Sequence, residues 1–159
     1  MTTAIFGLIG VLVGGVLNGV VTAAIEARRD ARALQAATRL LSIDVAGAKT
    51  TYEDCLQSGT WSSYPSRPLP LEQWEEWKNL LASRLGSSSD WRKLTAPFLD
   101  MRHNNELAAR HKDNDQMVQP SQEGMQKAVA RIDEAIPLLT HYVRGDHLRW
   151  NKIKATFRR

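Results

Sequence analysis

The hydrophobic pattern of the chain changes sharply at residue 26. Up to Ile25 no side chain carries a charge, and Glu26 is the first that does. An α-helix rises about 1.5 Å per residue, so about 20 apolar residues cross the ~30 Å hydrocarbon core of a bilayer. Residues 4–25 meet this length, and the run 5–13 has no polar face to present to water. Residues 1–25 are therefore predicted to form one transmembrane helix.

Two other interpretations of this segment compete with a membrane span. A cleaved signal peptide has basic residues before a short apolar core and a small-residue cleavage site, here Val-Thr-Ala at 21–23. No Lys or Arg precedes the apolar stretch, which is also longer than such a core. A buried helix of a water-soluble protein needs a polar side, which this run lacks. A retained span fits the pattern best.

Beyond the span, the pattern predicts that the same helix continues. No Gly or Pro occurs from residue 26 until Gly47, and apolar residues recur every seven positions, as in a helix that packs in a bundle. Gly59 follows the last periodic position and suits a helix C-terminal cap. The predicted packing seam consists of Leu34, Ala37, Thr38, Leu41, Val45, Ala48, Tyr52 and Cys55.

Three further helices are predicted after a proline-rich loop at 60–70. The second starts near Pro70, the third is capped by Ser89, and the fourth runs from Ser121 to Gly145. Pro97 is expected to bend the third helix or to lie in its early turns, and strand signals are nearly absent. The fold class is therefore all-α: a transmembrane helix continuing into a cytoplasmic bundle of about four helices at 26–145, then a tail at 146–159. The predicted inner stripes are Leu71, Trp74, Trp77, Leu81 and Leu85; Trp91, Leu94, Phe98, Met101 and Leu107; and Met125, Val129, Ile132, Ile136, Leu139 and Val143.

The predicted membrane helix has two unlike faces. At 100° per residue, Gly7, Gly10, Gly14 and Asn18 fall in one sector, and bulky aliphatic residues lie opposite. In lipid, small residues gather where helix backbones approach closely, and a buried amide gains from a partner across the interface. This face is the candidate for transmembrane association, with a second copy or with another membrane subunit. The alternatives are that glycine is simply common in membrane helices, or that several copies line a pore with this face.

Charge predicts the orientation of the span. Arg28, Arg29 and Arg32 follow it closely, and nothing basic precedes it. Basic residues next to a span stay on the cytoplasmic side, so the N-terminus is expected outside and the C-terminal domain in the cytoplasm, at the plasma (inner) membrane. The same arginines are candidates for contact with anionic lipid head groups.

The C-terminal tail is a basic amphipathic segment. Its apolar residues share one helical face, and its cations lie elsewhere, as in helices that rest on an anionic leaflet. The alternatives are a fifth helix covering the bundle or a frayed end. Nucleic-acid binding is disfavoured, because the patch is short and the net charge of +4 is modest. The apolar face consists of Trp150, Ile153 and Phe157, and the candidate lipid contacts are Lys152, Lys154, Arg158 and Arg159.

Candidate chemistry is sparse. The sequence contains one cysteine, Cys55, beside acidic residues that do not activate a thiol. Asp100, His103 and Glu106 share a helical face, but no second helix offers the matching carboxylates of a di-metal bundle. No catalytic, cofactor-binding or metal-binding residues are therefore assigned, and no cofactor or small-molecule substrate is expected. The tryptophans 74, 77 and 91 are interpreted as core, with an exposed aromatic groove as the alternative.

Several stretches resemble a broad set of uncharacterised single-pass membrane proteins common in actinobacterial genomes. The similarity lies in the Gly-rich span and in the segments 26–32, 37–41, 70–78, 80–82 and 89–94, and so in about the first two thirds of the chain. The chain departs from that pattern at Pro97, where such proteins continue a smooth helix. The resemblance implies an architecture and no reaction.

Together these patterns predict a membrane-anchored, non-enzymatic interaction or scaffold protein that associates through its glycine-rich face. The alternative is a small oligomeric effector that forms a pore or perturbs the membrane.

Overall fold

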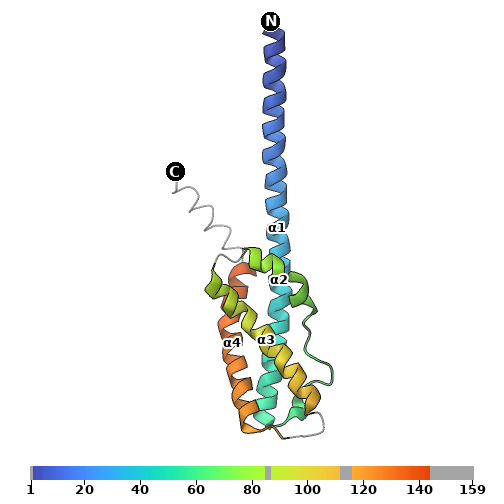
Figure 1. The fold of residues 1–159 in the computed structure, drawn as a ribbon, viewed down its shortest axis with the longest axis vertical. Helices are drawn as coiled ribbons and strands as arrows, with labels where there is room; N and C mark the ends of the chain where they lie inside the picture. Colours follow the sequence, from blue (N-terminus) through green and yellow to red (C-terminus); the bar gives the residue numbers. More distant parts are fainter. Residues whose placement is uncertain (1, 85–86, 112–115, 144–159) are drawn as a thin grey trace. The chain divides into compact units, whose positions relative to one another are not determined.

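The computed structural model describes residues 2–84, 87–111 and 116–143, with side chains from residue 14 onward. Over these residues the fold is all-α (Figure 1). The chain forms two compact units, Met1–Ala33 and Leu34–Arg159. The elements are α1 (Thr2–Ser58), the 3₁₀ turn η1 (Trp61–Ser63), α2 (Glu72–Arg84), α3 (Ser88–Arg110) and α4 (Gln119–Val143). This confirms the predicted helical bundle.

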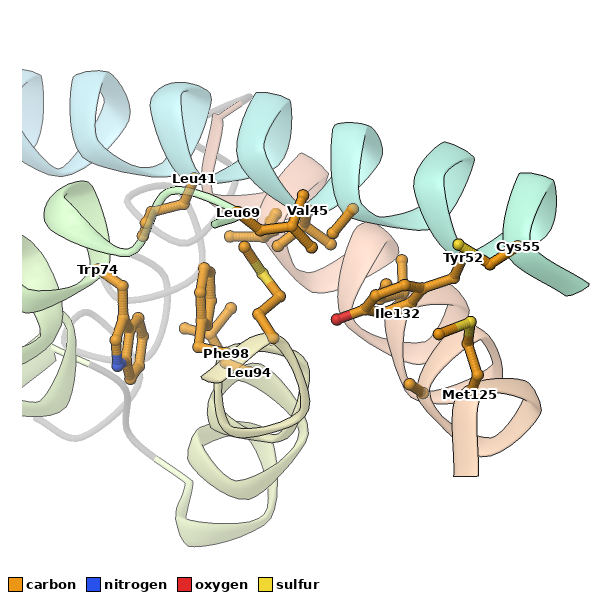
Figure 2. Close-up of a cluster of buried hydrophobic side chains, with 14 of the residues drawn as sticks. Leu41, Val45, Tyr52, Cys55, Leu69, Trp74, Leu94, Phe98, Met125 and Ile132 are labelled. Atoms are coloured by element: carbon orange, nitrogen blue, oxygen red, sulfur yellow. The ribbon is translucent and has the colours of Figure 1, made fainter. Parts of the chain in front are cut away.

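The predicted seam of α1 forms the centre of the bundle. All eight of its residues are buried, and Leu41, Val45, Ala48, Tyr52 and Cys55 have no exposed surface. A spacing of three and four residues keeps these side chains on one side of the helix, where α3 and α4 cover them. Figure 2 shows Leu41, Val45, Tyr52 and Cys55 along α1, facing Leu94 and Phe98 of α3 and Met125 and Ile132 of α4.

Gly59 ends α1, as predicted. Its φ of 68° lies in the left-handed region that glycine adopts without strain, and its N–H donates to the carbonyl of Cys55 at 2.9 Å. The following loop contains a turn that the sequence did not indicate, η1. This turn buries Trp61 against Tyr64 and His111, with ring centroids 6.0 and 5.9 Å apart.

The helix starts lie within two residues of the predicted positions. α2 begins at Glu72, near Pro70 as predicted, and the Glu72 carboxylate accepts from the N–H of Leu71 at 3.0 Å. The cap of α3 is Ser87 and not Ser89: the Ser87 hydroxyl accepts from the N–H groups of Ser89 (3.2 Å) and Asp90 (3.5 Å).

Two prolines lie inside helices. α3 continues past Pro97, which is buried beyond its early turns, and α4 contains the exposed Pro137. α4 begins at Gln119, two residues before the predicted Ser121. The predicted end of the fourth helix at Gly145 lies outside the described residues.

The tryptophans of the second and third helices pack in the interior, as interpreted from the sequence. Trp74 is buried and stacks on Phe98 at a centroid distance of 4.3 Å and on Trp91 at 5.5 Å. Trp77 is half-buried at the edge of the same core. This aromatic cluster joins α2 to α3.

Candidate functional site

The glycine-bearing part of α1 is the candidate site in the N-terminal unit. Every side chain from Gly14 to Arg29 is exposed. A Cβ atom placed on Gly14, Gly15 or Gly19 would meet no other atom within 4 Å. Asn18 lies one turn beyond Gly14, so the described half of the predicted face is uncovered. Gly7 and Gly10 lie before residue 14, where the description of side-chain surroundings begins.

The same segment exposes a continuous apolar surface. Val16 is 61% exposed and Val20 62%, and Leu17, Val21 and Ile25 are each more than half exposed. A helix that faces water usually carries polar side chains over most of its surface, and large exposed apolar patches mark contact with a membrane or another protein. Among the described residues, this patch is uncovered.

In the part of the chain whose side chains are described, no helical stretch is both long and apolar enough to cross a bilayer. The predicted span begins at Ala4, and the side chains of its first ten residues, 4–13, lie outside that part. The span therefore stays a prediction.

The predicted lipid-contacting cations fall into two groups. Arg28, Arg29 and Arg32 are exposed on α1 just before the bundle begins. α4 runs antiparallel to the bundle part of α1, to which it is tied by the Lys49–Asp133 ion pair at 2.6 Å (Figure 1). The C-terminal end of α4 therefore lies beside the N-terminal end of the bundle part of α1. The cations of the tail, Lys152, Lys154, Arg158 and Arg159, lie outside the described residues.

A buried polar cluster joins α1, α3 and α4. Asp100 of α3 accepts from the Arg131 guanidinium of α4 at 2.7 Å through one carboxylate oxygen, and its other oxygen is buried without a partner. Burial raises the pKa of Asp100, and the nearby Arg131 opposes that rise. Behind it, Asn104 is 4% exposed, and Tyr52 is fully buried with its pKa raised by desolvation. The sequence did not indicate this pairing of Asp100 with Arg131.

The residues considered for catalysis or metal binding are either buried or paired with basic side chains, apart from His103. Cys55 is fully buried, and burial raises the pKa of its thiol to about 11, so the thiol is protonated at neutral pH. Of the set Asp100, His103 and Glu106, the first pairs with Arg131, and Glu106 lies 3.9 Å from Arg110. No group of three or more His, Cys, Asp or Glu residues suited to a metal ion occurs among the described residues.

Comparisons of the chain with models of protein families, with curated proteins and with solved structures find no match.

Proposed function

We propose that this protein is a membrane-anchored, non-enzymatic interaction protein. The observation that carries the proposal is the apolar surface of α1 around Val16 and Val20, which the described chain leaves uncovered. A bilayer or a neighbouring transmembrane helix would cover it, and the uncharged residues 4–25 have the length of a span.

In this proposal the glycine face is the association surface. Gly7, Gly10, Gly14 and Asn18 would face a second copy of the chain or another membrane subunit, because small residues let two backbones approach closely. The N-terminus would lie outside. The bundle would lie in the cytoplasm, where Arg28, Arg29 and Arg32 would contact anionic head groups.

The basic C-terminal tail is the second proposed lipid contact. Its cations would then add to those of α1. Each basic residue near an anionic leaflet contributes about 1 kcal/mol of attraction.

The test of the association face is crosslinking of the full chain in membranes. Gly14→Leu places a bulky side chain on the face, and we expect the crosslinked dimer or heteromer to fall about fivefold or more, equivalent to ~1 kcal/mol of association free energy. The matched control is Gly19→Leu, the same change about 140° around the helix axis. It should leave crosslinking unaltered.

The outcomes separate the alternatives. Equal crosslinking in the two variants and the wild type would reject the glycine face. A ladder that ends in a large ring, and not in a dimer or a complex with a foreign subunit, would favour the pore-forming alternative. Extraction of the full chain into water without detergent would reject the anchor itself.

A further inference from the structure

Two hollows lie between α3 and α4 on the surface of the bundle. One, of about 350 Å³, is lined by residues that include Arg92, Lys93 and Glu134. The other, of about 370 Å³, is lined by residues that include Asp100, Asn104 and Lys127. Arg131 borders both, so the hollows meet at this side chain.

The hollows form one groove because their residues follow one face of each helix. On α3 the spacing is that of successive turns: Arg92, Ala96, Asp100 and Asn104 are each four residues apart. On α4 the order is reversed, with Lys127 in the second hollow and Glu134 in the first, as antiparallel helices require. From Ser89 to Leu107 the groove follows α3 for about 27 Å, at 1.5 Å per residue.

Small residues keep this groove open. Ala96 of α3 and Gly124 of α4 line its two halves, and a Cβ on Gly124 would meet no atom within 4 Å. The floor of the second half contains Asn104, whose amide lies almost wholly below the surface. A peptide helix can approach closely at the small residues, and the Asn104 amide offers a hydrogen-bonding group to its polar side chains.

The charge of the groove is positive. Its walls carry Arg92, Lys93, Lys127 and Arg131 against two carboxylates. One of those, Asp100, is held by Arg131 at 2.7 Å. Within the described residues no ion pair engages Lys93 or Lys127, so these ammonium groups are available to a ligand. A ligand that carries several carboxylates would complement these ammonium groups along the length of the groove.

We propose that the α3–α4 groove binds an acidic peptide segment of a partner protein. Glutamate or aspartate side chains pair with Lys93 and Lys127 on either side of Arg131, and small or apolar side chains of the peptide lie over Ala96 and Gly124. The carboxylates of Asp100 and Glu134 within the groove disfavour a nucleic-acid backbone, whose phosphates are closely and uniformly spaced. This surface lies on the bundle and goes beyond the association of the N-terminal helix.

The experiment measures fluorescence anisotropy of a labelled peptide with the full-length protein in detergent micelles. The probe is a peptide of about 18 residues of Glu, Ala and Leu, which matches the groove as a helix at 1.5 Å per residue. A second peptide has Gln in place of Glu. At low salt we expect the Glu peptide to bind about tenfold or more tightly than the Gln peptide, and this preference to fall as salt screens the charges.

Charge reversal locates the binding. Lys93→Glu with Lys127→Glu should weaken binding of the Glu peptide about tenfold or more. The matched control, Arg39→Glu with Arg67→Glu, makes the same charge change at exposed positions on α1 and on the loop before α2, neither of which lines the groove, and should alter affinity less than about twofold. Circular dichroism checks that each variant keeps its helix content.

Three results would overturn the proposal: no preference for the Glu peptide, equal losses in the two double variants, or tighter binding of a duplex oligonucleotide than of the peptide. The Gly14→Leu variant should bind the Glu peptide like the wild type, because Gly14 lies outside the bundle unit. Failure of the groove proposal is thereby distinguished from failure of the glycine face.

Discussion

Asn105 is the side chain that fixes the long connection between α1 and α2. Its Oδ1 accepts from the Tyr64 hydroxyl at 2.7 Å and from the Leu69 N–H at 2.8 Å, and its Nδ2 donates to the Leu69 carbonyl at 3.0 Å. One amide of α3 thus satisfies both backbone groups of a buried loop residue. A loop with three prolines makes few backbone hydrogen bonds of its own, so this side chain takes their place.

Replacement of Asn105 by Ala should therefore destabilise the protein. Loss of three part-buried hydrogen bonds, with the Leu69 backbone left unpaired, is expected to lower the free energy of unfolding by about 2–3 kcal/mol. Urea unfolding of the full chain in detergent measures this loss. Asn79→Ala, at an exposed position of α2, is the control and should change stability by less than about 0.5 kcal/mol. Equal effects of the two substitutions would contradict the role given to Asn105.

Asp44 makes a pH-dependent contribution to stability. Burial first, and then the like charge of Glu72, raise the pKa of this carboxyl above 3.8, and one of its oxygens is buried without a partner. The folded state therefore holds the proton more tightly than the unfolded state. Stability falls as pH rises from about the unfolded value through the raised folded pKa.

The Asp44→Asn variant removes this ionisation. We expect it to be more stable than the wild type at neutral pH, where Asp44 is ionised, and the difference to shrink as pH falls toward 3.8. Urea unfolding of the two proteins across this pH range measures the difference. A gap that stays constant or widens at low pH would show that Asp44 is not an unfavourable charge in the fold.

At the scale of the element, the bundle part of α1 shows why periodicity is informative. Leu40 and Leu41 are neighbours in sequence, yet Leu40 is 41% exposed and Leu41 is fully buried. The helical repeat alone distinguishes them, because Leu41 lies on the seam and Leu40 lies about 100° away. The two side chains are chemically identical, so their positions on the helix decide how much each contributes to the free energy of unfolding.

This contrast gives a direct test of the seam. Leu41→Ala should lower the free energy of unfolding by about 2–5 kcal/mol, through lost burial and the cavity left behind. Leu40→Ala should cost less than about 1 kcal/mol. Thermal and urea unfolding of the two single variants provide the comparison. Similar losses at the two positions would mean that α1 packs on a different face from the one in Figure 2.

The features that the sequence predicts well are those set by neighbouring residues. The seam of α1 and the cap at Gly59 follow from local spacing and backbone preference, and both are confirmed. The Asp100–Arg131 ion pair joins residues 31 apart, so no local pattern indicates it. Lys127 and Arg131 are four residues apart on α4, so the sequence indicates a row of basic side chains. That this row lines a groove follows only from the position of α3 beside it.

At the scale of the whole molecule, the two units differ in the surface they expose. The segment around Val16 exposes a run of apolar side chains, whereas the bundle packs a large set of apolar residues into one buried cluster and exposes charged ones. Such a contrast is expected when two parts of one chain have different solvents. The uncharged stretch ends at Ile25 and is followed by Arg28 and Arg29, and a bilayer boundary at this point would explain the change.

The proposed orientation can be tested with single reporter cysteines, because the native Cys55 is buried and its raised thiol pKa of about 11 makes it unreactive at neutral pH. Thr2→Cys should react with a membrane-impermeant maleimide in intact cells, because the proposed orientation places the N-terminus outside. Ser66→Cys, on an exposed loop of the bundle, should react only after the membrane is permeabilised. The unsubstituted chain should stay unlabelled in both states. Labelling of Ser66→Cys in intact cells would place the bundle outside and refute the orientation.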